Sequence, residues 1–398
     1  MNQMKYTCLF GGGAVRGIAY VGVIKALEEL NIQIKTSGGS SVGSIIAVLA
    51  AVGYSADEIE KVFLKVNFDL FKDVELSIRP KLALSKGEVF LKWIRGLIES
   101  KYYGKRYVQG KNNPVTFADL DKNLVIITTD LSNYDCKEFS RFETPDYEIA
   151  KAIRISCTMP GLMRPIEYDN AILVDGDLQK SWPMWKLSKN FLLPDERVLE
   201  FRLEGYTKEH EMNAINFANT IYSCMTAMST TFIVDIYGKK DKFDYVVLNT
   251  GDIIIVDFNL PREKRKQLIS LGYEQTIAYF KKELPRKKAV ILAHYKKIST
   301  HIAKIKKLID KNKPVKAKAQ VNELFGDLCE LNKIIDLADY EQLKEFRTLF
   351  FANIKYPSLF GKVKLKNEEQ VKSAIDEIKI KISEKIAGFE AYLSEFPL

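Results

Sequence analysis

A run of three glycines directly after a short apolar segment constrains the fold of this chain more than any other feature. Residues 5–10 predict a buried strand, Gly11 to Gly13 follow it, and residues 18–30 place apolar side chains at helical spacing. Glycine tolerates the sharp backbone turn that such a junction needs. The start of the chain therefore predicts a strand, a tight glycine loop and a helix.

The same order recurs in the next part of the chain. Residues 32–37 predict a second strand, broken by Gly38 and Gly39, and residues 45–52 predict a helix of apolar and small residues. Strands that alternate with helices form a mostly parallel sheet covered on both faces, which is the α/β class. Further β-branched runs predict strands over residues 124–129, 171–174, 198–203, 245–248 and 253–256.

The pattern changes near residue 285. An apolar stripe recurs every three or four residues from Ile291 to Ile309, which predicts a helix. We therefore expect two domains, an α/β domain over residues 1–284 and a basic, all-helical C-terminal region over residues 285–398. Further helices are predicted over residues 321–337, 343–354 and 371–393.

Basic charge is concentrated in the C-terminal region. Residues 281–398 carry 25 Lys and Arg against 16 Asp and Glu, which accounts for the formal net charge of +9. Residues 281–320 alone hold 14 basic and 2 acidic residues, interleaved with the isoleucine stripe. This pattern suits peripheral contact with an anionic membrane, although a solvated helix whose stripe packs on its neighbours has the same pattern. Since no known nucleic-acid-binding module accompanies the lysines, we expect no nucleic-acid partner.

Cysteine usage and hydropathy indicate the compartment. The five cysteines are scattered and form no CxxC pair, which argues against a disulfide framework or a zinc site. The first residues reach the glycine run too early for a signal peptide, and no segment approaches the ~20 apolar residues of a membrane span. We expect a cytoplasmic protein that is at most peripheral at a membrane.

Residues 39–43 match the pattern G-x-S-x-G, in which a sharp strand-to-helix turn exposes a serine hydroxyl. Small flanking residues are needed because the backbone doubles back, and the helix after Ser41 directs its dipole toward a developing oxyanion. The motif alone is weak, because serines between glycines are common in ordinary turns. Ser41 is therefore a candidate nucleophile that needs support from elsewhere in the chain.

The first glycine loop offers backbone N–H groups that suit an anion, either a nucleotide phosphate or the oxyanion of an acyl-transfer intermediate. A Rossmann loop requires an acidic residue at the end of the second strand, where this chain has Gly38 to Ser41. A phosphate-binding P-loop ends in Gly-Lys-Ser/Thr, whereas this loop ends Arg16-Gly17-Ile18. Both nucleotide patterns fail, which leaves the oxyanion or a structural glycine turn.

A serine nucleophile needs a base, and the chain has three histidines. His294 and His301 lie in the helical tail, where we expect them to be exposed. His210 remains an alternative base, because the order Ser, Asp, His suits an α/β-hydrolase. Asp175 is the stronger candidate, since it ends an apolar strand and precedes Gly176, although Asp-Gly is also a common turn.

The glycine loop (residues 12–17), the serine motif (39–43) and Asp175-Gly176 resemble, in this order and at these separations, the patatin-like phospholipase family. Residues 116–120 and 156–161 add weaker matches, and the resemblance covers roughly residues 4–280. It implies a three-layer α/β/α fold and a lipid acyl hydrolase without metal or cofactor. The residues that it implies are Ser41 as nucleophile, Asp175 as base, the backbone N–H groups of Gly12, Gly13 and Ala14 as oxyanion hole, and Arg16 as the loop's basic residue.

Arg16 has two interpretations, a brace for the loop through hydrogen bonds to carbonyl groups or a contact to a lipid phosphate. The sequence also departs from the family pattern, which follows Asp-Gly with Gly or Ala and then Asn-x-Pro. Here Asp177 follows, and then Ser181-Trp182-Pro183. A second carboxylate close to Asp175 would raise the pKa of one of the two.

These departures leave other functions open. Asp177 could itself serve as the functional acid, or the chain could be a catalytically silent lipid-binding or regulatory protein. A soluble esterase or thioesterase with no membrane role is a further alternative. The main expectation is a phospholipase A-type lipid acyl hydrolase that acts on phospholipid esters.

Overall fold

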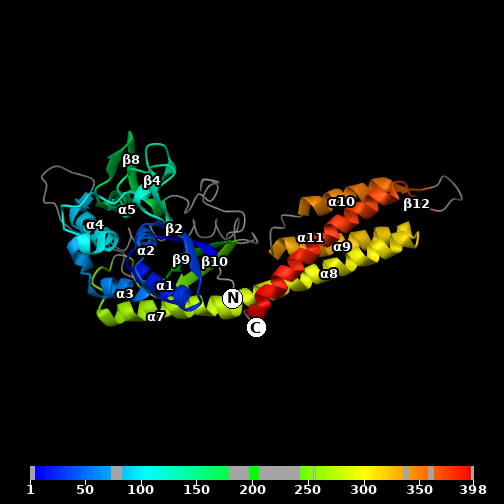
Figure 1. The fold of residues 1–398 in the computed structure, drawn as a ribbon, viewed down its shortest axis with the longest axis horizontal. Helices are drawn as coiled ribbons and strands as arrows, with labels where there is room; N and C mark the ends of the chain where they lie inside the picture. Colours follow the sequence, from blue (N-terminus) through cyan, green and yellow to red (C-terminus); the bar gives the residue numbers. More distant parts are fainter. Residues whose placement is uncertain are drawn as a thin grey trace. The chain divides into compact units, whose positions relative to one another are not determined.

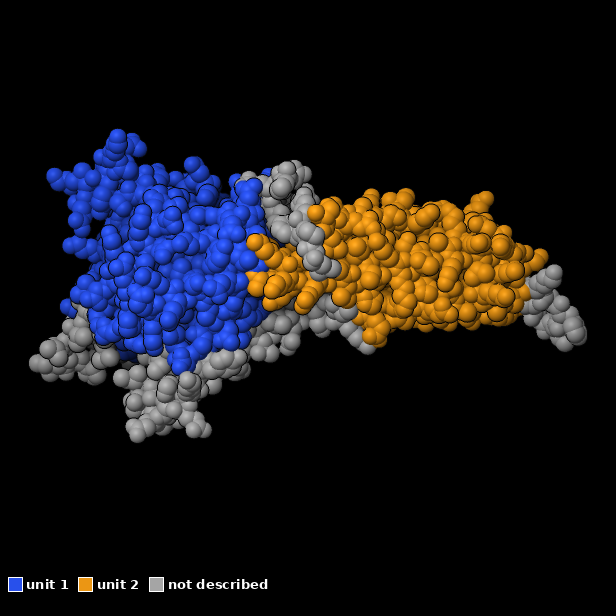
Figure 2. Space-filling model, turned by 90° about the horizontal axis from the view of Figure 1, so that it is seen from below, with its two compact units in different colours: residues 1–238, 242–277 blue, residues 239–241, 278–398 orange. Residues whose placement is uncertain are grey.

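The computed structural model describes residues 5–72, 83–178, 197–205, 243–253, 255, 257–334, 340–356 and 363–395 (Figure 1). They fall into two compact units, which Figure 2 draws in blue and orange. Unit 1 comprises residues 1–238 and 242–277, and unit 2 comprises residues 239–241 and 278–398. The predicted domain boundary after residue 284 lies close to this division and stays a prediction.

Unit 1 is built on an eight-stranded sheet in the order β10-β9-β1-β2-β4-β8-β7, with β5 paired to β4. All neighbours from β10 to β4 are parallel, while β5, β7 and β8 join through antiparallel pairs. The predicted α/β class with a mostly parallel sheet is thereby confirmed. The strands are β1 (Lys5–Phe10), β2 (Gln33–Ser40), β4 (Asn123–Asp130), β5 (Asp135–Ser140), β7 (Ile166–Tyr168), β8 (Ala171–Asp175), β9 (Arg197–Glu204) and β10 (Phe243–Asn249), with a separate pair of β3 (Ala83–Ser85) and β6 (Gly161–Met163).

The helix that follows β2 packs directly on the sheet. Every residue of α2 (Val42–Ala51) is buried, because the helix contacts β1, β2 and β4 on one side and α1, α4 and α5 on the other. The described helices of unit 1 are α1 (Ala19–Glu29), α2, α3 (Ala56–Lys65), α4 (Glu88–Tyr103), α5 (Ile149–Ser156) and α7 (Arg262–Ala278). Short 3₁₀ turns are η1 (Ala14–Ile18), η2 (Phe68–Lys72), η3 (Gly104–Arg106), η4 (Phe117–Asp119) and η5 (Gly176–Leu178).

Two strand predictions need correction. β2 is not broken at Gly38 and Gly39 but continues to Ser40, because the ladder to β1 and β4 runs through these residues. Of the strand expected over residues 253–256, the structure describes Ile253 and Ile255 and places both outside any strand. Their carbonyl oxygens instead accept hydrogen bonds from the Arg16 side chain and the Val15 main chain, respectively.

Unit 2 is helical, as predicted, but it is not all-helical, because one short pair of strands joins two of its helices. Its helices are α8 (Leu284–Asp310), α9 (Pro314–Ile334), α10 (Tyr340–Asn353) and α11 (Glu368–Glu395), preceded by the π-helical η6 (Tyr279–Glu283); β11 (Ile354–Lys355) and β12 (Lys364–Leu365) form a short antiparallel pair. The stripe from Ile291 to Ile309 is buried in the core of this unit. No described helix is long and apolar enough to cross a membrane.

The expectation that His301 is exposed is wrong. The side chain of His301 is 9% exposed, because it faces α9 with Nε2 2.8 Å from Asp327 Oδ2. His294 is half-buried on the same helix.

Candidate active site

Ser41 occupies a strained turn between β2 and α2. Its backbone φ of 50° and ψ of −129° lie outside the regions that most side chains adopt, at a cost of about 1–3 kcal/mol. The main-chain N–H of Ser44 (2.9 Å) and its hydroxyl (2.6 Å) both donate to the Ser41 carbonyl. The Ser41 N–H donates to Ser156 Oγ at 2.9 Å. These bonds fix the turn and leave the Ser41 side chain directed into a pocket.

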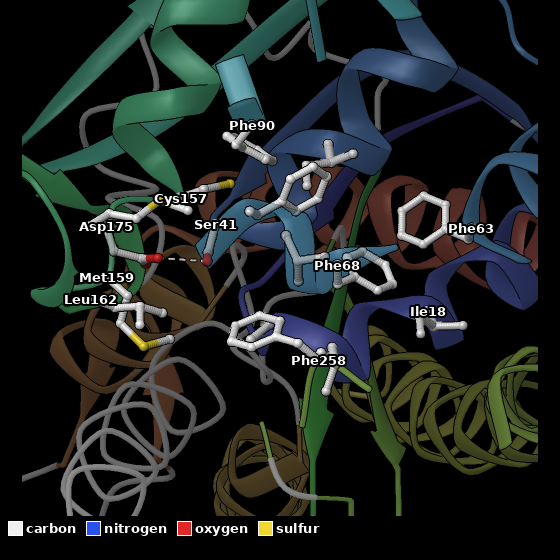
Figure 3. A pocket seen from close by; sticks show the side chains of 16 residues that line it. Ile18, Ser41, Phe63, Phe68, Phe90, Cys157, Met159, Leu162, Asp175 and Phe258 are labelled. Atoms are coloured by element: carbon white, nitrogen blue, oxygen red, sulfur yellow. Dashed lines mark hydrogen bonds between the residues drawn. The ribbon is translucent and has the colours of Figure 1, made fainter. Parts of the chain in front are cut away.

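The Ser41 hydroxyl donates a hydrogen bond to Asp175 Oδ2 at 2.7 Å (Figure 3). Asp175 is fully buried at the end of β8, where its N–H donates to the Thr158 carbonyl at 2.8 Å. Its other oxygen, Oδ1, accepts the Asp177 N–H at 2.9 Å. The structure thus brings together the two residues that sequence analysis selects, in the geometry that a serine and its general base require.

The glycine loop begins directly after β1 and continues into η1. The Gly11 N–H donates to the Phe201 carbonyl at 3.0 Å, and the Gly12 N–H donates to Asp177 Oδ1 at 3.2 Å. Gly13 and Ala14 have φ values of 146° and 47°. Within the described part of the chain, their N–H groups have no acceptor.

The predicted oxyanion trio of Gly12, Gly13 and Ala14 stays a prediction. The Gly12 N–H already serves a carboxylate, which leaves Gly13 and Ala14 as candidate oxyanion donors. Sequence patterns identify the loop, but the partner of each N–H group depends on side chains that arrive from other strands.

Arg16 braces this loop. The residue is 6% exposed and its Nε donates to the Ile253 carbonyl at 2.7 Å, while the neighbouring Val15 N–H donates to the Ile255 carbonyl at 3.3 Å. Burial lowers the pKa of Arg16. This geometry fits the loop-support interpretation and leaves little access for a lipid phosphate.

Asp177 is buried beside the Ser41 and Asp175 pair, but its carboxylate faces away from the Ser41 hydroxyl. Its Oδ1 accepts from Gly12 N–H, from Ser40 Oγ at 3.3 Å and from Arg202 Nη1 at 3.4 Å. The Ser41 hydroxyl donates its hydrogen bond to Asp175 and not to Asp177. This geometry does not favour Asp177 as the functional acid. Ser181-Trp182-Pro183 and the alternative base His210 lie outside the described residues.

An apolar pocket opens at the Ser41 hydroxyl, with a cavity volume of about 90 Å³. Figure 3 shows the side chains of Phe68, Phe90 and Phe258 around it, with Ser41 and Asp175 pointing toward each other. Burial raises the pKa of the Cys157 thiol, which lines the same pocket. The walls also include Val15, Ile18, Val42, Ile45, Phe63, Phe71, Met159, Leu162 and Met163.

Several residues that shape the site carry no strong sequence signal. The Ser156 hydroxyl accepts the hydrogen bond of the Ser41 N–H and donates to the Ile127 carbonyl at 2.6 Å. In the sequence, Ser156 lies in a segment that matches the family only weakly. Glu200 and Arg202 on β9 lie outside the glycine loop, the serine motif and the Asp-Gly motif. Among the described residues, no group of His, Cys, Asp and Glu could hold a metal ion.

Comparison with known proteins places the chain in a family. The sequence profile described as patatin-like phospholipase matches residues 9–183, which include Ser41 and Asp175. The YqhO protein of Bacillus subtilis (strain 168) is 30% identical over 297 residues, which span 69% of this chain and 97% of that protein. The chain belongs to the patatin-like phospholipase family.

Other relatives share parts of this patatin-like chain. A protein named as a probable lipid hydrolase of Invertebrate iridescent virus 6 is 29% identical over 184 residues, 45% of this chain and 61% of that protein. VipD from Legionella pneumophila superposes with a TM-score of 0.52 at 16% identity, covering 96% of this chain and 88% of VipD. At this identity VipD supports the fold and not the activity.

Proposed function

We propose that this patatin-like protein is a lipid acyl hydrolase of the phospholipase A type that works through an acyl-enzyme on Ser41. The hydrogen bond of 2.7 Å between Ser41 Oγ and Asp175 Oδ2 is the observation that carries the proposal. Asp175 takes the hydroxyl proton as Ser41 Oγ attacks the ester carbonyl, and the proton passes to the leaving alcohol. Water then attacks the acyl-enzyme with Asp175 again as base, which releases a carboxylic acid and restores the serine.

The glycine loop supplies the oxyanion donors in this proposal. Main-chain N–H groups of Gly13 and Ala14 lie in the loop beside the pocket and have no acceptor in the described structure. A single oxyanion donor typically contributes about 10² to 10³ in rate. The donors are therefore as important to turnover as the base.

The pocket favours an acyl chain as the bound part of the substrate. Its walls are aromatic and aliphatic, and a buried chain gains about 0.8 kcal/mol for each CH₂ group removed from water. The family membership and the name of the viral relative both support a lipid ester. The headgroup would then lie outside this apolar cavity.

Turnover of variants tests this proposal. Ser41→Ala should abolish release of fatty acid from phosphatidylcholine vesicles and from a soluble p-nitrophenyl ester. Asp175→Asn should lower kcat by about 10² to 10⁴, because the amide cannot accept the serine proton. Ser37→Ala and Asp244→Asn replace a buried serine and a buried aspartate elsewhere in the sheet, so both should retain turnover. Unchanged kcat in folded Asp175→Asn would contradict the proposed base.

We also propose that unit 2 contacts anionic membranes through its charge alone. The isoleucine stripe is buried and cannot insert into lipid, but Lys304, Lys307, Lys311, Lys313 and Lys316 are exposed and have no ion-pair partner in the described structure. Each lysine close to an anionic surface contributes about 1 kcal/mol, and salt screens this attraction. The contact would concentrate the enzyme where its substrate is.

A further inference from the structure

We propose that Asp177 is the positioning residue of the glycine loop, held in place by Arg202, which also pairs with Glu200. The inference rests on the proposed acyl hydrolase function and adds a residue to it. Asp177 would touch neither substrate nor the reacting atoms. It would act through Gly12, so that Gly13 and Ala14 present their N–H groups to the oxyanion.

The contacts of Asp177 join separate strands at one oxygen atom. Its Oδ1 accepts from Gly12 after β1 (3.2 Å), from Ser40 at the end of β2 (3.3 Å) and from Arg202 on β9 (3.4 Å). Its main-chain N–H donates to Asp175 Oδ1 at 2.9 Å. One residue thus connects the loop, the strand that carries the nucleophile, and the base.

The glycines of the loop match this arrangement. A Cβ atom on Gly12 would lie 2.7 Å from Asp177 Cγ, and a Cβ atom on Gly11 would lie 2.8 Å from Arg202 Nη1. The loop backbone therefore packs directly on the Asp177 and Arg202 side chains. The Gly11 N–H donates to a main-chain carbonyl, whereas the Gly12 N–H donates to the Asp177 side chain. Asp177 therefore anchors the residue immediately before Gly13 and Ala14.

Arg202 pairs with the Asp177 carboxylate, and Glu200 in turn pairs with Arg202. Arg202 Nε donates to Glu200 Oε1 at 2.6 Å, and the Arg202 and Glu200 side chains are 3% and 0% exposed. Burial alone would lower the pKa of Arg202, but the charges of Glu200 and Asp177 outweigh it and raise that pKa. An isolated buried charge is costly, and Arg202 is the cation that the Asp177 and Glu200 carboxylates share. Arg202 therefore holds the Asp177 carboxylate in position.

Hydrogen exchange and turnover of Asp177→Ala test the proposal in the full-length protein. The peptide over residues 8–18 should exchange about tenfold faster, and kcat for a soluble ester should fall about 10- to 100-fold with KM within about twofold, because an oxyanion donor is misplaced. Asp177→Asn keeps an acceptor for Gly12 and Ser40. It should therefore recover most of the loop protection and most of kcat. Glu99→Gln removes a buried carboxylate in α4 that has no contact to the loop, and it should match the wild type.

The outcomes separate this proposal from the proposed function. Wild-type protein without turnover would contradict the hydrolase function, while the exchange of the loop would still decide the role of Asp177. A folded Asp177→Ala variant with wild-type exchange over residues 8–18 overturns the proposal, even if its melting temperature falls. If Asp177→Ala does not fold, Ser40→Ala removes one donor to the same oxygen and should show an intermediate loss of loop protection. Unchanged exchange in Ser40→Ala would then overturn it.

Discussion

At the scale of residues, the site depends on close approaches that tolerate no side chain. A Cβ atom on Gly43 would lie 2.0 Å from the Phe10 carbonyl oxygen, and one on Gly39 would lie 2.2 Å from Gly43 main-chain atoms. The first turn of α2 therefore rests directly on β1. This packing, together with the left-handed φ of Ser41, aims the hydroxyl at Asp175.

Gly43→Ala should consequently damage both stability and turnover. Because the methyl group would meet backbone atoms, α2 must shift, and we expect a loss of about 2–4 kcal/mol in the free energy of unfolding. Gly96→Ala is the matched control in α4, where a Cβ meets nothing closer than 3.6 Å, and it should stabilise by about 0.5–1 kcal/mol. Denaturant unfolding measures both variants. Wild-type stability in Gly43→Ala would contradict the packing described for this turn.

The sequence predicts the Ser41 and Asp175 pair because both residues lie in short motifs with known chain order. The roles of Asp177 and Gly12 are not predictable in the same way. Asp177 is expected close to Asp175, and it is, but the turn η5 directs its carboxylate toward Gly12 and Arg202. Arg202 reaches that point through the pairing of β9 with β1, which no local pattern records.

At the scale of elements, periodicity predicts most of the fold, and tertiary contacts explain the exceptions. β2 continues through two glycines because parallel ladders on both sides hold it. Ile253 and Ile255 have strand composition, yet their carbonyl groups satisfy the glycine loop. Strand propensity is a weak predictor where another element uses the same backbone groups for its own hydrogen bonds.

The stability of the protein should depend on pH through Glu138 on β5. Burial is the main cause that raises the pKa of Glu138 to about 7, so between the ordinary value of 4.5 and about 7 the folded state binds more protons than the unfolded state. Stability must then fall as pH rises through this window. Glu138→Gln should raise the free energy of unfolding by about 1–2 kcal/mol at pH 8 and leave it unchanged at pH 4. The effect is smaller than the full pKa shift would give, because Glu138 is partly exposed to solvent. Unfolding at both pH values, with exposed Glu167→Gln as control, measures this difference. A gain independent of pH would contradict it.

At the scale of the whole molecule, the two units divide the chemistry. The candidate site, its pocket and the loop anchors belong to unit 1, while the basic excess of the chain belongs to residues 281–398. The sequence predicts the helices of unit 2 and its charge. It does not decide whether the isoleucine stripe faces lipid or protein, because both arrangements have the same periodicity, and the structure buries the stripe.

Vesicle sedimentation tests the membrane proposal for unit 2. Lys307→Glu, Lys311→Glu and Lys313→Glu combined should weaken binding to phosphatidylserine vesicles at least tenfold at low salt, since each exposed lysine contributes about 1 kcal/mol. Lys92→Glu, Lys105→Glu and Lys111→Glu change the charge equally on exposed positions of unit 1 and should have a smaller effect. Equal loss in the two triple variants would show a dependence on net charge and not on this surface.

The central claim, an acyl-enzyme on Ser41, is tested most directly by a fluorophosphonate probe, which mimics the tetrahedral intermediate and bonds covalently to an activated serine. Mass spectrometry of the labelled full-length protein locates the adduct. The account predicts one adduct on Ser41 in the wild type, its loss in Ser41→Ala and strongly slowed labelling in Asp175→Asn. An unlabelled wild type, or an adduct on another residue, would contradict the account.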